Sequence, residues 1–138
     1  MHKPIMACVA VVGFGVAFAG LAQAQQPAVS MPQQALKRDM LQTFDVPGTG
    51  YETRIGTSEL GPNERSGRQS HPGPEGGYVL AGSGTVKVDG QPPMAVKAGQ
   101  SYKLAAGAVH DVQSGPNGVT LLVTWVVRKG QPLATPAR

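Results

Sequence analysis

From residue 51 onward, short runs of alternating apolar and polar residues are separated by turn-forming Gly, Pro, Asn and Asp. A period of two residues is typical of β-strands with one buried face, because successive side chains point to opposite sides of a strand. The pattern predicts strands over residues 51–60, 78–81, 85–88, 94–97, 101–104 and 119–128. The Asp-Gly pair at 89–90 predicts a tight hairpin turn. Strands at this spacing favour a β-sandwich or barrel.

The last of these strands is apolar on both faces. Leu122 and Val126 lie on the face opposite to the row formed by Val119, Leu121, Val123, Trp125 and Val127. A strand that is apolar on both faces is normally covered on both. We therefore expect a second layer over the outer face, most simply the second subunit of a homodimer. An N-terminal helix could cover this face instead.

Such a helix is predicted over residues 31–42, where apolar side chains between Ala35 and Leu41 recur at helical spacing. The Val-Pro-Gly segment at 46–48 would end it. We expect residues 25–44 to form a flexible arm followed by this short helix, packed on the outside of a barrel over 45–130. Residues 131–138, which contain two prolines, are expected to form a tail.

The first 24 residues have the features of a secretory signal peptide. Lys3 precedes a continuous run of apolar and small residues over 5–21, and Ala-Gln-Ala at 22–24 supplies a cleavage site. A membrane anchor is the alternative interpretation, but the apolar run is short for a membrane span and no basic flank follows it. We expect cleavage after Ala24, a periplasmic or secreted protein, and no stable membrane anchor.

Composition narrows the function classes. The 138 residues suffice for one domain, and the single cysteine, Cys8, would leave with the leader. Disulfides, thiolate metal sites and Cys-based catalysis are then excluded from the mature chain. The net charge of +4 is scattered over the sequence, which argues against a nucleic-acid partner. The few aromatic residues, Tyr78, Tyr102 and Trp125 among them, are interpreted as core-filling.

The candidate chemistry centres on the two histidines that remain after cleavage, His71 and His110. Gln69 and His71 would point to the same face of a strand, and the Pro-Gly-Pro turn at 72–74 can fold Glu75 back beside His71. Two imidazoles and one carboxylate are typical ligands of Fe(II) and also suit Mn(II). Gln69 could add its amide oxygen. The spacing alone does not show that His110 meets the others, and a solvated His-Pro turn is the competing interpretation.

Two segments resemble the motifs of the cupin superfamily. Residues 63–82 resemble the first motif, G-x5-H-x-H-x3-E-x6-G, and residues 99–114 resemble the second, G-x5-P-x-G-x2-H-x3-N. The spacing agrees without a gap in both. The matching positions are His71, Glu75, Gly82, Gly99, Gly107 and His110, while other residues stand at four positions: Asn63, Gln69, Ala105 and Ser114.

The resemblance implies an all-β fold, a small barrel of jelly-roll type. The one short N-terminal helix predicted above would be added to this barrel. It also implies a metal held by Gln69, His71, Glu75 and His110, and frequent dimerisation. The amide of Gln69 is a poorer ligand than imidazole for Zn, Ni or Cu, so Fe(II) or Mn(II) is the favoured divalent metal ion.

Three functions remain open at this point. The first is a metal-dependent enzyme, dioxygenase-like or isomerase-like, acting on a small organic molecule, with Glu75 as ligand and candidate catalytic base. The second is a non-catalytic periplasmic module that binds a small molecule or a metal. The third is a structural cupin with a degenerate metal site. The second and third functions are favoured by three departures from the cupin motifs, at Gln69, Ala105 and Ser114. Whether the chain is an enzyme stays open.

The leader generates a prediction of its own. Protein recovered from the exported fraction should begin at Gln25, because signal peptidase cuts after the second alanine of the Ala-Gln-Ala segment. Intact-mass measurement of that material checks it. Recovery of a chain that still carries Met1 in the membrane fraction would contradict the prediction.

Overall fold

Antiparallel β-strands supply the regular structure of residues 36–138, the part of the chain that the computed structural model describes. In chain order the strands are β1 (Lys37–Asp45), β2 (Tyr51–Leu60), β3 (Gln69–Ser70), β4 (Glu75–Val88), β5 (Met94–Lys97), β6 (Ser101–Leu104), β7 (His110–Arg128) and β8 (Thr135–Pro136). Within this part of the chain there is no helix, and therefore none that could cross a membrane.

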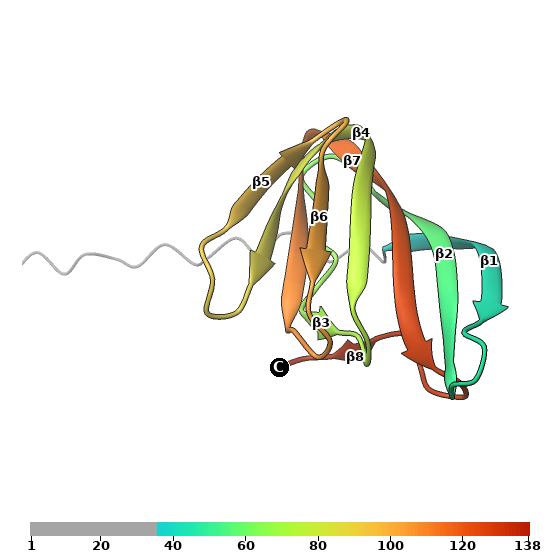
Figure 1. The fold of residues 1–138 in the computed structure, drawn as a ribbon. Coiled ribbons are helices and arrows are strands. Elements are labelled where there is room, and N and C mark those ends of the chain that lie inside the picture. Colours follow the sequence, from blue (N-terminus) through green and yellow to red (C-terminus); the bar gives the residue numbers. More distant parts are fainter. Residues whose placement is uncertain (1–35) are drawn as a thin grey trace, which may run out of the picture.

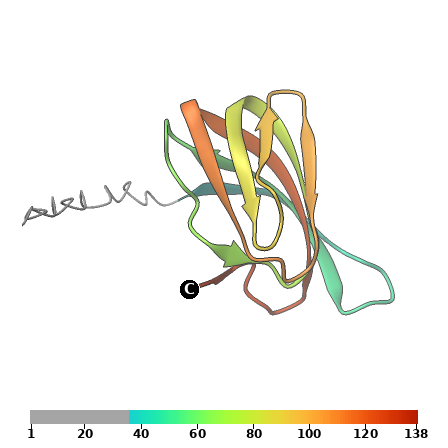
Figure 2. The same cartoon turned by 90° about the vertical axis from the view of Figure 1, so that its left-hand side faces the viewer.

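The strands form one strongly curled sheet, a half-barrel (Figures 1 and 2). Neighbouring strands follow the order β1-β2-β7-β3-β8, and β4 pairs with β5, β6 and β7. The long strand β7 is central because β2, β3 and β4 all pair with it. The β4–β7 register shifts between Val79 and Ala81 and again between Gly82 and Gly84. Such bulges bend a strand, which helps the sheet to curl around its interior.

The concave side of the sheet holds the hydrophobic core. Val123, Trp125 and Val127 of β7 are at most 1% exposed, and Val79 and Val86 of β4 are fully buried. This confirms the predicted inward face of the last strand. The outward-facing Leu122 and Val126 are only partly buried.

Most of the predicted strands are present. Three of them have the expected bounds, which are 51–60, 94–97 and 101–104. The strands expected at 78–81 and 85–88 are one continuous strand, β4, because Gly82 adopts a φ of 74° at a bulge and the chain bends there without leaving the sheet. The strand expected at 119–128 extends back to His110.

The helix predicted over 31–42 is wrong for residues 37–42, which belong to β1 and pair with β2. The physical reason is a bulge at Leu41, where the register shifts between Met40 and Gln42. A bulge adds one residue to the alternation of a strand, and that extra residue imitates helical spacing. Residues 1–35, which include the expected leader, the cleavage site and the arm, lie outside the described residues.

Two further expectations need correction. Tyr78, interpreted as core-filling, is 45% exposed on the outer side of β4. The tail over 131–138 includes β8, which pairs with Gln69 and Ser70 of β3. Leu133, just before β8, packs against the core. The tail therefore covers one edge of the interior, next to the residues that the sequence singles out.

Candidate metal site

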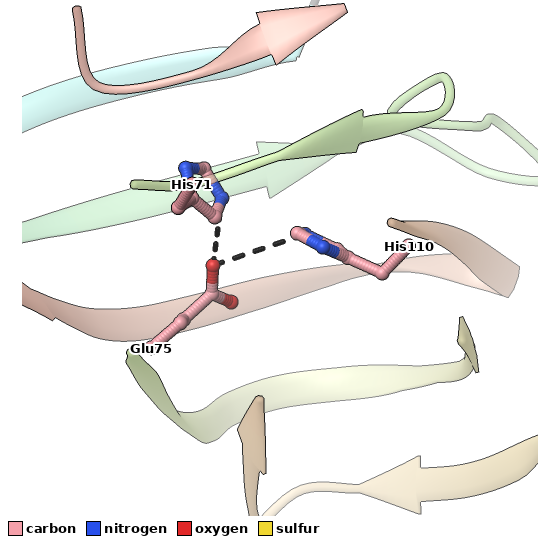
Figure 3. A group of neighbouring side chains, drawn as sticks. All are labelled: His71, Glu75 and His110. Atoms are coloured by element: carbon pink, nitrogen blue, oxygen red, sulfur yellow. Dashed lines mark ion pairs between the residues drawn. The ribbon is translucent and has the colours of Figure 1, made fainter. Parts of the chain in front are cut away.

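The side chains of His71, Glu75 and His110 converge inside the curled sheet (Figure 3). Nε2 of His71 lies 2.8 Å from Oε2 of Glu75, and Nε2 of His110 lies 3.8 Å from the same oxygen. One potential ligand atom from each residue lies within 4.8 Å of the other two. The three residues are only 2–6% exposed. The structure thus brings together two segments that the sequence spacing alone could not join.

Strand pairing explains why these residues meet. Gln69 of β3 pairs with His110 of β7, so the first and second motifs lie side by side. Glu75 begins β4 opposite Trp125. The turn between β3 and β4 is packed tightly, since a Cβ atom at Gly73 would lie 1.6 Å from the carbonyl oxygen of Val126. A glycine there lets the turn lie against β7 and return Glu75 to the side of the preceding histidine.

Both imidazole rings are oriented by backbone carbonyl groups. Nδ1 of His71 lies 2.6 Å from the carbonyl oxygen of Leu133, and Nδ1 of His110 lies 3.0 Å from that of Ala108. A carbonyl only accepts hydrogen bonds, so each Nδ1 carries the proton and donates it. In the neutral ring the lone pair is then on Nε2, which faces the other members of the group. This is the usual arrangement around metal-binding histidines.

The carboxylate of Glu75 is held by two buried donors. The hydroxyl of Tyr102 donates to Oε1 at 2.8 Å, and Nε1 of Trp125 donates to Oε2 at 2.9 Å. Burial on its own raises the pKa of the Glu75 carboxyl. The close approach and positive charge of His71 when its ring is protonated, followed by the charge of a protonated His110 and the Tyr102 hydroxyl, outweigh burial, and the net pKa falls below its ordinary value. The group is therefore a carboxylate at neutral pH.

Tyr102 remains a hydrogen-bond donor. Its burial, and then the charge and hydrogen bond of Glu75, raise the pKa of the phenol far above the ordinary value. Tyr102 and Trp125 are core residues, as predicted, but they also fix the carboxylate. This second role was not among the expectations from the sequence. A signal for it was present, because a buried Tyr or Trp normally finds a partner for its polar group.

Within the group of His71, Glu75 and His110, one buried atom lacks a hydrogen bond. Nε2 of His71 is close enough to Glu75 for an ion pair, but no hydrogen bond of acceptable geometry joins them, and the nitrogen is buried without another partner. An unsatisfied buried polar atom is costly. A cation between the two imidazole lone pairs and the carboxylate would satisfy it. The residues therefore fit a divalent metal ion, and this group could bind one.

Gln69 lies on the wall of the same interior, and its Oε1 accepts a hydrogen bond of 3.0 Å from Nη2 of Arg38. An amide oxygen has a second lone pair, so Gln69 remains a candidate ligand. Arg38 was not singled out in the sequence, because residues 31–42 were interpreted as a surface helix. No local signal identifies it, since its position depends on the pairing of β1 with β2.

Little open space remains around the group. A cavity of about 20 Å³ lies among Arg38, Gln69, Glu75, Tyr102 and His110. That volume holds roughly one water-sized sphere. A larger hollow of about 670 Å³ lies along the β4–β5 hairpin, but none of the three converging residues lines it. The chemistry of the donor set, not the size of the hollow, makes the smaller cavity the candidate site.

Comparisons with known proteins agree with the geometry. The family model of the cupin domain matches residues 56–127, which is more than half of the chain and includes all three converging residues. No curated protein sequence is significantly similar to the chain.

Solved structures share the fold at low identity. A cupin-like protein from Thermotoga maritima aligns with a TM-score of 0.59 and 22% identity, over 74% of this chain and 75% of its own. A DMSP lyase from Ruegeria pomeroyi aligns with a TM-score of 0.62 and 16% identity, over 75% of this chain and 52% of its own. An oxalate oxidase in complex with glycolate aligns with a TM-score of 0.59 and 21% identity, over 78% of this chain and 57% of its own. The chain thus spans about half the length of the DMSP lyases.

The buried donors of the carboxylate generate a prediction. Replacing Tyr102 by Phe should lower the free energy of unfolding by about 1.5–3 kcal/mol, because Oε1 of the Glu75 carboxylate loses its buried donor. Urea denaturation checks this. Tyr78→Phe is the matched control, since Tyr78 is 45% exposed and the substitution keeps its ring, so stability should change by less than about 0.5 kcal/mol. Equal effects of the two substitutions would contradict the assignment.

Proposed function

This chain belongs to the cupin family, and we propose that it binds one divalent metal ion, Fe(II) or Mn(II), and binds or transforms a small organic molecule there. His71, Glu75 and His110 would hold the ion, with Gln69 as a candidate fourth ligand. The observation that carries the proposal is the buried, unpartnered Nε2 of His71 beside a charged carboxylate.

The donor set supports these two metals over others. Two nitrogens and a carboxylate, without a thiolate, suit Fe(II) and Mn(II). Such an ion, when bound, supplies Lewis acidity and redox chemistry suited to dioxygenase-like or isomerase-like reactions. The chain's own groups have separate tasks. Glu75 carries the negative charge, since its pKa is lowered, and Tyr102 and Trp125 keep both of its oxygens in place.

The structural neighbours support the substrate class in general terms. They include a DMSP lyase and an oxalate oxidase in complex with glycolate. At 16% and 21% identity these likenesses concern the fold alone. We therefore carry over to this chain only the idea that a barrel of this type can act on small organic molecules. We propose that the barrel of this chain also binds or transforms a small organic molecule. We further propose that the protein acts outside the cytoplasm, after its leader is removed.

A second candidate is a non-catalytic periplasmic cupin, structural or small-molecule-binding, with a degenerate metal site. The small interior favours it, because about 20 Å³ does not admit an organic molecule unless a side chain moves. The engagement of the Gln69 oxygen by Arg38 favours it as well. Metal content separates the two candidates. Stoichiometric Fe or Mn in protein purified from its native compartment supports the first, and metal-free protein supports the second.

Ligand substitutions test the metal site. His71→Ala, Glu75→Ala and His110→Ala should each weaken Mn(II) binding by at least about tenfold, because each removes one ligand of a small set. Gln69→His should strengthen Ni(II) or Zn(II) binding more than Mn(II) binding, because imidazole nitrogen outranks amide oxygen for late first-row metals. Titration calorimetry measures all four variants. Asp45→Ala, an exposed carboxylate in β1, is the control and should change nothing.

Two outcomes of that titration would be decisive against parts of the proposal. If Gln69→His leaves every affinity unchanged while His71→Ala abolishes binding, position 69 does not contribute to the site. If none of the four substitutions matters, no metal site exists here and the non-catalytic cupin becomes the better reading.

We also propose a homodimer formed through the outer face of the sheet. Tyr78 of β4 pairs in register with Leu122 of β7, and Leu80 and Phe44 add exposed apolar surface on the same side, at 48% and 52% exposure. Light scattering at micromolar concentration should give the mass of two chains. The double substitution of Tyr78 and Leu80 by Lys should give one chain, whereas Met94→Lys, on β5, should leave the dimer intact. A monomeric wild-type protein would contradict the proposal.

A further inference from the structure

Arg38 is the one cationic side chain that lines the interior cavity, among the described residues. It pairs in register with Ser58, which pairs with Leu121, so all three lie on the concave face of the sheet. The guanidinium carbon lies 6.0 Å from the centroid of the Trp125 ring. Nη2 donates to Gln69, whereas Nε is buried and has no hydrogen-bond partner. The side chain thus offers an unused donor inside the barrel.

The guanidinium also lacks a direct counter-ion. The ion pairs found among residues 36–138 do not include Arg38. Burial lowers the pKa of Arg38, and the negative charge of Glu75 only partly opposes this. Both oxygens of Glu75 already accept hydrogen bonds from other side chains. Arg38 is partly buried, and a cation that loses water without gaining a counter-ion is unfavourable, so the interior has an unmet demand for negative charge.

A divalent metal ion would increase that demand. Glu75 is the only carboxylate among the cavity-lining residues, and it cannot neutralise both the ion and Arg38. With the ion bound, the interior would keep two net positive charges. Burying such an excess charge is costly, and a small anion that lies between the ion and the guanidinium would reduce it.

From this geometry we infer that the site takes a small carboxylate, with Arg38 as the residue that recognises it. The inference rests on the proposed metal site and names the substrate class for it. A guanidinium offers several N–H donors in a planar fork that matches a carboxylate. The cavity of about 20 Å³ holds roughly one water-sized sphere, so even a carboxylate of one or two carbon atoms enters only if a side chain such as Arg38 swings outward.

Gln69 then has the specific task of positioning Arg38. Its amide oxygen accepts from Nη2 and so holds the guanidinium over the site, which leaves Nε for the ligand. A histidine at this position has no side-chain oxygen to hold the guanidinium in this way. Gln69 is in this view a positioning residue for Arg38.

The test uses the full mature chain, with formate and acetate as probes and acetamide as the neutral match for acetate. Mn(II) binding is measured first by calorimetry and tests the proposed metal site alone. The Mn(II)-loaded protein is then titrated with each probe, followed by calorimetry and by the fluorescence of Trp125, the only tryptophan of the chain. The variants are Arg38→Gln and Arg38→Lys, with Arg128→Gln as the control because Arg128 stacks on exposed Tyr51, outside the cavity.

We expect formate or acetate to bind and acetamide not to bind. Arg38→Gln should weaken binding of the carboxylate by at least about tenfold. The affinity of Arg38→Lys should lie between those of the wild type and Arg38→Gln, because Lys keeps the charge but not the planar array of N–H donors. Arg128→Gln should bind like the wild type. Mn(II) affinity should not fall in Arg38→Gln, because the substitution removes a positive charge near the ion, and Mn(II) binding also shows that this variant is folded.

Different failures have different meanings. If Mn(II) binds but carboxylates bind Arg38→Gln and the wild type equally, or acetamide binds as well as acetate, the role of Arg38 is overturned while the metal site stands. If Mn(II) does not bind the wild type, the proposed function fails and the inference fails with it.

Discussion

The interior of the sheet is organised around the buried carboxylate of Glu75. Glu75 sits at the start of β4 inside an apolar sheet, where an isolated charge would be very unfavourable. Its two oxygens accept hydrogen bonds from Tyr102 and Trp125, and two imidazoles face it. Tyr102 comes from β6 and Trp125 from β7, so the carboxylate joins the strands on either side of β4. The hydrogen bonds that hold the strands together around Glu75 therefore also fix the carboxylate of the candidate metal site.

The two motifs that meet around Glu75 are brought together by β7. This strand supplies His110 at one end and the core residues Val123 and Trp125 farther along, and it pairs with β2, β3 and β4. The C-terminal segment adds the carbonyl of Leu133, which fixes the ring of His71. The site is thus assembled from segments up to 62 residues apart, and each is held by strand pairing or by a backbone carbonyl. Such support limits the freedom of the ligands before any ion binds.

Much of this arrangement follows from the sequence. Alternation identified the strands of the core because each has one inward face. Spacing could place Glu75 near His71, but only the resemblance to the cupin motifs brought His110 to them. The helix predicted over 31–42 is wrong for residues 37–42, because a bulge at Leu41 shifts the alternation of β1 by one residue. Arg38 was missed for the same reason, since its inward direction depends on a register with β2 that lies far away in the sequence. Long-range pairing, not local preference, decides such positions.

The central claim is that this buried carboxylate and the two imidazoles hold a metal ion. Anomalous diffraction from crystals of the protein grown with Mn(II) tests it most directly. The account predicts one strong anomalous peak per chain, within bonding distance of Nε2 of His71, Nε2 of His110 and the carboxylate of Glu75. Crystals without a peak there, or with His71 Nε2 hydrogen-bonded to a protein group or a water in its place, would contradict it.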